Sequence, residues 1–295
     1  MSSDMSYDTL IIGQVCRDHN TDYDGAVFQM PGGAVLYSGH AAAAIGHRVA
    51  VLPKGAGSDY TSVFGGQPNI TVYPVYSPSD TEMTSVFFTA DRERRDSRCA
   101  GMIEPYRPEE IPAIDARLYH LAGLVKGDIG DDMIAACASR GDTAVDVQCL
   151  LRCREPDGSL VFRDWAEKRE FLPLIRFLKT DAAEASVLTG LTDRAAAAKT
   201  LYDWGAKEIM ITHNSEVLVY DGETVYTQPL RPRSLAGRTG RGDTCFSAYI
   251  TERLTRDIPS ALLFAAALVS LKMETPGPFT GTRRDAENYI NEFYN

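Results

Sequence analysis

The sequence lacks the patterns that mark several large classes of protein. It contains no Gly-x4-Gly-Lys-Ser/Thr segment, which excludes a P-loop nucleotide-binding protein. Its first apolar segment is followed by QVCRDHN, residues 14–20, and not by Gly-x-Gly-x-x-Gly, which argues against a dinucleotide-binding oxidoreductase. It has no basic block either: the net charge of −10 is spread along the chain, so we expect no nucleic-acid partner.

Paired cysteines and long apolar runs are also missing. Cys149 and Cys153 are close in sequence, but no pair of histidines completes a zinc site, and the six scattered cysteines favour a reducing compartment. The N-terminus, MSSDMSYDTL, has no basic region followed by an apolar run, so we expect no signal peptide. The longest apolar run, Ala261 to Leu271, is too short to span a bilayer. We therefore expect a soluble, cytoplasmic protein without a membrane partner.

Apolar strands alternate with helices along most of the chain. A strand at Tyr7–Val15, a helix rich in small residues at Leu36–Ile45 and a strand at Arg48–Leu52 predict a parallel βαβ unit. From Arg117 onward the alternation resumes, with strands at RLYHLAG, TAVDVQ, FLKT and EIMITH and helices at residues 131–139, 181–188, 193–204, 244–254 and 260–273. No linker rich in Pro, Gly or Ser divides the chain, so we predict one α/β domain over residues 1–295.

One region, residues 71–100, departs from this alternation. ITVYPVY and TSVFFTA are short and rich in β-forming residues, and the polar DRERRDSR lies between TSVFFTA and the end of the region. Strands from about residues 16–30 and 71–100 are expected to leave the main sheet and form a small β-flap, or lid. A plain surface hairpin is the alternative interpretation.

The segment Gly237–Asp243, GRTGRGD, comes directly before an amphipathic helix. The first N–H groups of a helix are unpaired and favour an anion, and glycines let a ligand approach the backbone. Asp243 also suits an ordinary helix N-cap, but a cap requires neither Gly-x-Gly nor Arg238 and Arg241. We predict that the amides of residues 240–242 hold a phosphoryl group and that Asp243 takes the proton of an attacking hydroxyl.

This segment resembles the second signature of the ribokinase-like (PfkB) carbohydrate kinase family, Asp-Thr-x-Gly-Ala-Gly-Asp. Gly240, Arg241, Gly242 and Asp243 occupy its last four positions, while Gly237 replaces the first Asp and Arg241 replaces a small residue. The resemblance implies a ribokinase-like three-layer α/β/α sandwich with a lid, and Asp243 as the catalytic base. It also implies ATP and Mg²⁺ as cofactors, transfer of the γ-phosphate to a hydroxyl of a sugar or polyol, and a possible homodimer through the lid.

The N-terminal half resembles the first signature of the same family. PGGAVLYSGHAAAAIGHRVAVLPKGAGSD contains the double glycine Gly32-Gly33, an Ala-rich helix and a Gly-x-Gly-x-Asp at residues 55–59. The resemblance implies that the double glycine lets the acceptor approach the backbone and that Asp18 binds acceptor hydroxyls, although Asp18 also suits a surface loop. Tyr37 stands where the family has Asn, which points to a non-standard acceptor.

The segment FLKTDAAEASVLTG resembles the Asn-x-x-Glu segment of the family, with Asp181 in place of Asn and Glu184 in place of Glu. The resemblance implies that Glu184 acts on Mg²⁺ through water, as Mg²⁺ keeps several waters in proteins. The same spacing is that of a helix capping box, and both roles are compatible. Gln148, at the end of VDVQ, is a further candidate for the acceptor site. Candidates for the cofactor site implied by the resemblance also include Thr212, Arg238 and Thr239.

Several functions stay open on the sequence alone. A carbohydrate acceptor is the default of the family, but Tyr37 and Arg241 also suit an inositol or nucleoside kinase of the same fold. A non-catalytic ligand-binding relative is a third possibility. The intact Gly-x-Gly-Asp argues against it, because a protein that only binds its ligand has no use for a base at Asp243.

Overall fold

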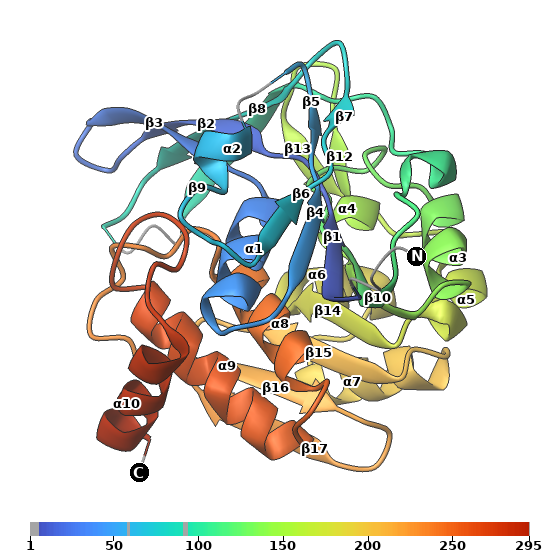
Figure 1. Cartoon of the computed structure of the whole chain (residues 1–295), viewed down its shortest axis with the longest axis vertical. Helices are drawn as coiled ribbons and strands as arrows, with labels where there is room; N and C mark the ends of the chain where they lie inside the picture. Colours follow the sequence, from blue (N-terminus) through green and yellow to red (C-terminus); the bar gives the residue numbers. More distant parts are fainter. Residues whose placement is uncertain (1–5, 58–59, 91–93, 295) are drawn as a thin grey trace, which may run out of the picture.

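The computed structural model describes residues 6–57, 60–90 and 94–294, and within these residues a nine-stranded sheet forms the centre of the molecule (Figure 1). From one edge to the other, its strands are β17 (Val225–Pro229), β16 (Glu216–Tyr220), β15 (Glu208–Thr212), β14 (Phe177–Asp181), β11 (Asp142–Asp146), β10 (Ala116–Leu121), β1 (Tyr7–Ile12), β4 (Val49–Leu52) and β6 (Ile70–Val72). Strand pairs are parallel except β15–β16 and β16–β17, and the β16–β17 hairpin turns at Asp221-Gly222.

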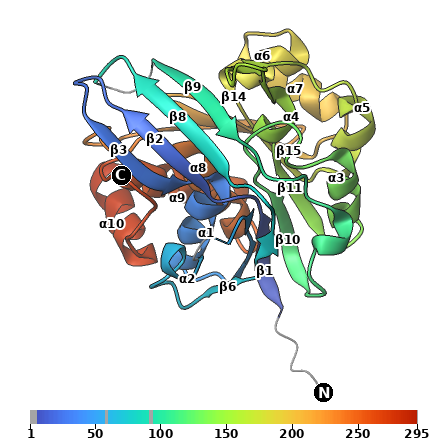
Figure 2. The same ribbon diagram turned by 90° about the horizontal axis from the view of Figure 1, so that it is seen from above.

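Helices cover both faces of this sheet (Figures 1 and 2). On one face lie α1 (Ala34–Ala44), α8 (Arg241–Glu252), α9 (Ile258–Lys272) and, packed on α9, α10 (Arg283–Phe293). On the other face lie α3 (Asp131–Ala138), α6 (Ala182–Thr189) and α7 (Arg194–Asp203). The buried strands leave apolar side chains on both faces of the sheet, and each face needs a helical cover. The predicted three-layer α/β/α fold is confirmed.

Several short elements complete the described chain. They are β5 (Lys54–Gly55), α2 (Tyr60–Val63), β7 (Val75–Tyr76), α4 (Gln148–Leu151), β12 (Arg152–Arg154), β13 (Leu160–Phe162), α5 (Lys168–Phe171) and the 3-10 turns at Pro108–Glu110 and Leu172–Leu174. Among the helices of the described residues, none is both long and apolar enough to cross a membrane.

A second sheet of four strands stands apart from the main sheet (Figure 2). Its order is β3 (Val27–Gly32), β2 (Cys16–Thr21), β8 (Thr81–Phe87) and β9 (Arg95–Gly101). We call this sheet the lid. It is more than the surface hairpin that was the alternative interpretation. The prediction that the lid includes residues 71–76 was wrong: β6 pairs with β4 at the edge of the main sheet, and β7 pairs with β5.

The start of α8 also differs from the sequence prediction, which placed it at Thr244. The helix begins at Arg241, because Gly240 takes a left-handed conformation with φ of 76° and serves as the N-cap. Asp243 is therefore not the cap residue. It lies inside the first turn of the helix, among the backbone N–H groups that have no helical acceptor.

Candidate active site

Two adjoining cavities lie between the lid and the carboxyl ends of the parallel strands, where open α/β sheets bind their ligands. We call the first, of about 300 Å³, the arginine cavity; its lining includes Arg95, Gln148, Lys179, Asp181, Thr212, Asn214, Arg238, Thr239, Gly240, Arg241, Gly242 and Asp243. We call the second, of about 110 Å³, the lid cavity; its lining includes Cys16, Asp18, Asn20, Gly33, Tyr37, Ser85, Arg95, Ser97, Gln148, Arg152, Thr239, Gly240 and Asp243. Asp243 lines both, so it stands at their junction.

The glycine-rich loop before α8 is held in place by close contacts that only glycine permits. A Cβ on Gly240 would lie 2.2 Å from the Tyr37 ring, and a Cβ on Gly237 would lie 1.8 Å from the Thr275 carbonyl oxygen. The second contact explains why Gly237 replaces the Asp of the family pattern. The amide of Arg241, predicted to hold a phosphoryl oxygen, instead donates to the Arg238 carbonyl oxygen at 3.2 Å.

A group of charges surrounds Asp243. Burial and the neighbouring Asp146 raise the pKa of the Asp243 carboxyl to about 6, against the opposing effect of the Lys179 ammonium. Lys179 is 5% exposed and its Nζ lies 2.8 Å from Asp146 Oδ2. Asp146 therefore orients Lys179, and a carboxyl with a pKa near 6 is ionised at neutral pH and still basic enough to accept a proton.

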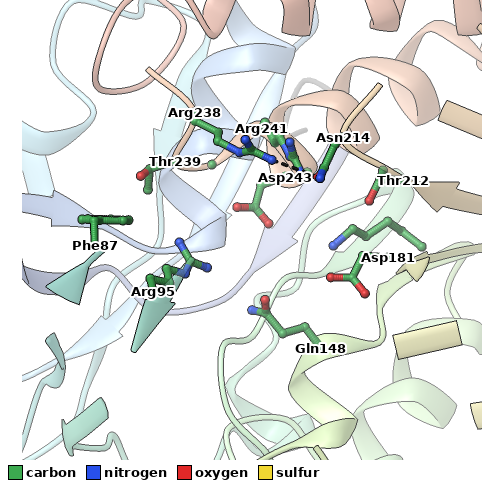
Figure 3. A pocket seen from close by; sticks show the side chains of 13 residues that line it. Phe87, Arg95, Gln148, Asp181, Thr212, Asn214, Arg238, Thr239, Arg241 and Asp243 are labelled. Atoms are coloured by element: carbon green, nitrogen blue, oxygen red, sulfur yellow. Dashed lines mark hydrogen bonds between the residues drawn. The ribbon is translucent and has the colours of Figure 1, made fainter. Parts of the chain in front are cut away.

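Two arginine side chains meet at one amide oxygen in the arginine cavity. Arg241 donates to Asn214 Oδ1 at 2.6 Å and Arg238 donates to the same atom at 2.9 Å (Figure 3). Arg241 departs from the family pattern, and the structure shows that its side chain is held by Asn214. Burial lowers the pKa of Arg241, opposed by Asp181. Two guanidinium groups, those of Arg238 and Arg241, therefore lie together beside the first turn of α8.

Four of the predicted acceptor residues line the lid cavity, namely Asp18, Gly33, Tyr37 and Gln148. Gly32 is not part of this lining. A Cβ on Gly32 would lie 2.2 Å from Asp18 Oδ2, so the first glycine makes room for this carboxylate. Burial raises the pKa of Asp18, while the thiol of Cys16, which donates to Asp18 Oδ1 at 3.0 Å, lowers it. Gly33, with φ of 105°, allows the chain to turn into α1 beside the cavity.

Several residues of the site were not found from the sequence. Arg95 extends from the lid strand β9 toward Asp243 (Figure 3), and Arg152 follows α4. Both lower the pKa of Asp18, and Nε of Arg152 is buried without a hydrogen bond to any described residue. Ser85 and Ser97 face each other across the lid, with 3.0 Å between their hydroxyl oxygens. The polar segment DRERRDSR contains Arg95 and Ser97 and was a signal for both; Arg152 and Ser85 had none.

The cofactor candidates divide into two groups. Asp181, Thr212, Arg238 and Thr239 line the arginine cavity, whereas Glu184 is 2% exposed and lies behind it. Glu184 and Asp181 form the capping box of α6, and burial raises the pKa of Glu184 to about 7. The described residues contain no group of three His, Cys, Asp or Glu side chains that could hold a metal directly. This donor set fits Mg²⁺ that is bound mainly by phosphate oxygens and water.

Two further features of the first signature are settled differently. His40 is packed inside α1, where its Nε2 lies 3.1 Å from the Val63 carbonyl oxygen and its ring stacks on Phe64. His40 is therefore a packed side chain and does not belong to the site. Asp59, the last residue of the first signature, lies outside the described residues.

Comparison with known proteins gives the same class of enzyme. No family model matches the chain. A pyrophosphate-dependent kinase in the ribokinase family, solved with a pyrophosphate analogue and myo-inositol, is 30% identical with a TM-score of 0.85, covering 95% of this chain and 99% of that one. A ribokinase of Arabidopsis thaliana, solved with ribose and ATP, is 15% identical with a TM-score of 0.75, covering 97% and 99%. The cytidine kinase of Thermococcus kodakarensis is 24% identical over 253 residues, 82% of this chain and 87% of that protein.

The fold and the cleft are those of a kinase that phosphorylates a small molecule, a phosphotransferase with an alcohol group as acceptor. Because the identity of 30% extends over almost the full length of both chains, the relationship is more specific than a shared fold. This chain belongs to the ribokinase family, and the resemblance seen in its two signatures is confirmed.

Proposed function

We propose that this enzyme transfers a phosphoryl group from inorganic pyrophosphate to a hydroxyl of a cyclic polyol of the inositol type. The observation that carries the proposal is the pair of guanidinium groups, Arg238 and Arg241, joined through Asn214 in the arginine cavity. Arginine recognises phosphate through two parallel hydrogen bonds, and pyrophosphate offers only phosphate oxygens for recognition. The sequence resemblance implied ATP; the arginines at and beside the anion hole favour the smaller donor.

The transfer uses the residues at the junction of the two cavities. Asp243 accepts the proton of the acceptor hydroxyl as that oxygen attacks the phosphorus atom. The Gly240 and Gly242 amides and the Lys179 ammonium stabilise the charge on the phosphoryl oxygens, and the arginines hold the departing phosphate. Asp181 and Glu184 would orient the waters of Mg²⁺, which neutralises phosphate charge when bound.

The lid cavity supports a small polyol as the acceptor. Its lining offers hydrogen-bond acceptors, chiefly the Asp18 carboxylate, and donors such as Arg152, arranged around a small space. A ring that carries a hydroxyl on every carbon can use both kinds of group. The relative solved with myo-inositol, at 30% identity, supports this choice over ribose or cytidine.

ATP stays the second candidate for the donor because of a third cavity. This apolar cavity of about 420 Å³ adjoins the loop before α8, and its lining includes Phe28, Met30, Ala236, Pro276 and Gly277. Such a surface suits a nucleotide base. The two donors make opposite demands, since ATP uses the apolar cavity and pyrophosphate leaves it empty.

A matrix of donors and acceptors tests the proposal. We would measure kcat/KM for pyrophosphate and for ATP, each with Mg²⁺, against myo-inositol, ribose and cytidine. The expected result is the highest kcat/KM for pyrophosphate with myo-inositol, about 100-fold above ATP, which corresponds to about 2.8 kcal/mol. A higher kcat/KM for ATP with every acceptor would overturn the choice of donor, and a preference for cytidine would overturn the choice of acceptor.

We further propose that the enzyme forms a homodimer through the lid and works in the cytoplasm. Within the described residues, β3 pairs on one side only, with β2, and Val27 on it is 75% exposed. The six cysteines form no disulfide, which suits a reducing compartment. Light scattering of the purified enzyme should give twice the mass of one chain, and Val27→Lys should shift it toward the monomer; a monomeric wild-type enzyme would contradict the dimer.

A further inference from the structure

A buried ammonium group lies directly under the loop that precedes α8. Lys272, the last residue of α9, is 3% exposed, and its Nζ donates to the carbonyl oxygens of Gly237 and Thr239. The same Nζ lies 5.0 Å from the centre of the Tyr37 ring. Within the described residues, Lys272 has no carboxylate partner at ion-pair distance. Burial lowers the pKa of Lys272 to about 7, and the nearby Asp243 opposes this shift. Burying a charge is costly, so the contacts of Lys272 with the loop call for an explanation.

These contacts fix the direction of a peptide group in the anion hole. The Thr239 carbonyl and the Gly240 amide belong to one planar trans peptide, in which C=O and N–H point in opposite directions. Because Lys272 holds the Thr239 carbonyl, it turns the Gly240 amide away from α9. Gly240 lines both cavities beside Asp243, so this amide faces the side on which a phosphoryl group is transferred.

The rest of the loop is fixed from the same direction. The amide of Gly237 donates to the Met273 carbonyl oxygen at 2.7 Å, and Gly237 packs against Thr275 with no room for a Cβ. The Tyr37 ring also fills the space under Gly240. Among the described residues, Lys272 is the only charged side chain that donates to the Gly237 and Thr239 carbonyl oxygens. Its ammonium lies between the loop and the aromatic face of Tyr37.

We propose that Lys272 is a positioning residue of the reaction: its ammonium is an internal cation that orients the loop 237–240 and thereby the Gly240 amide of the anion hole. It does not touch the substrate in this role. The inference requires phosphoryl transfer at Asp243 and is independent of whether pyrophosphate or ATP is the donor, so the two proposals fail separately.

The test compares Lys272→Met, which keeps the volume without the charge, with Lys272→Ala, which leaves a space. Both should lower kcat by about 100-fold, the usual cost of one oxyanion-hole donor, while KM for the acceptor changes little. Ammonium or methylammonium ions should enter the space left by the side chain in Lys272→Ala and raise the kcat of this variant at least about tenfold. The same salts should leave wild type and Lys272→Met unchanged, since neither has that space.

Thermal unfolding of each variant separates this role from a loss of folding. If Lys272→Met and Lys272→Ala do not fold, Lys272→Gln carries the test, because its amide donates one hydrogen bond to the loop without a charge. Wild-type kcat in any folded neutral variant would overturn the proposal. So would a reduced kcat in Lys272→Ala that no small cation raises, because the side chain would then act only through packing.

Discussion

The aromatic ring of Tyr37 lies directly under Gly240, so close that a Cβ on the glycine would come within 2.2 Å of it. Tyr37 belongs to the first signature of the sequence and Gly240 to the second. Their contact joins the acceptor side of the cleft to the anion hole. Tyr37 departs from the family pattern, and the structure shows two roles for it. Its ring packs under the loop at Gly240, and the residue also lines the lid cavity.

The hydroxyl of Tyr37 should act on the acceptor. It is buried, makes no hydrogen bond to any described residue, and belongs to a side chain that lines the lid cavity. Tyr37→Phe should raise KM for the acceptor about tenfold, the value of one neutral hydrogen bond, and leave KM for the donor unchanged. Tyr37→Ala should instead lower kcat, because the loop loses its support. Equal acceptor KM values in wild type and Tyr37→Phe would remove the hydroxyl from the acceptor site.

Asp243 should be essential for the chemical step and dispensable for binding the donor. Asp243→Asn keeps the shape of the side chain and removes the base, so kcat should fall by about 100- to 10,000-fold. Calorimetric titration should show nearly unchanged affinity for pyrophosphate. Asp142→Asn is the matched control, because Asp142 lies at the amino end of β11, where it pairs with Arg176 and lines neither cavity. Turnover of Asp243→Asn near that of wild type would show that Asp243 is not the base.

The raised pKa of Asp243 predicts a specific dependence on pH. Since the base must be ionised, kcat/KM of wild type should fall as the pH drops below about 6. The profile should be followed from pH 5 to 8 with a saturating donor. A profile that stays flat down to pH 5 would contradict an Asp243 pKa near 6.

The same pKa makes a prediction for stability. The folded-state pKa of about 6 lies above the ordinary value of 3.8, so the protonated carboxyl stabilises the fold below pH 3.8 and this stability is lost as the pH rises through 6. At pH 8 the charged carboxylate is therefore unfavourable. Asp243→Asn should raise the free energy of unfolding by on the order of 1–2 kcal/mol at pH 8 and by less at pH 5. A variant that is less stable than wild type at pH 8 would contradict this.

Arg241 should contribute mainly to handling of the donor. Arg241→Ala removes one of the two guanidinium groups that Asn214 holds. The loss should raise KM for pyrophosphate by about 10- to 100-fold, as expected for a charge-assisted contact. Arg241→Lys keeps the charge without the planar fork and should recover only part of the loss. Unchanged kinetics of Arg241→Ala with every substrate would show that Arg241 takes no part in binding the donor.

The fold could be predicted from the sequence where the signal is local. Buried strands such as β1 and β14 are short apolar runs, and the helices between them carry ordinary start and stop signals. The start of α8 was misplaced because the left-handed conformation of Gly240 is set by its contact with Tyr37, which is distant in sequence. Residues 71–76 were assigned to the lid because short alternating segments suit either sheet, and only the pairing of β6 with β4 and of β7 with β5 decides between them.

The candidate site divides in the same way. The glycines and Asp243 are neighbours in the sequence, so their place in one site could be predicted before the fold was known. Lys272 and Arg152 lie in segments with no motif, and their importance comes from where α9 ends and where the chain turns after α4. Arg238 and Arg241 stand in the glycine-rich motif, but their shared partner Asn214 became visible only when the two loops were placed side by side.

The central claim is tested most directly by following the reaction of the purified enzyme with pyrophosphate, Mg²⁺ and myo-inositol by ³¹P NMR. Transfer from pyrophosphate predicts that one phosphomonoester and one orthophosphate appear for each pyrophosphate consumed, and that Asp243→Asn forms both at least about 100-fold more slowly. Consumption of pyrophosphate without a phosphomonoester, or product from ATP alone, would contradict the account.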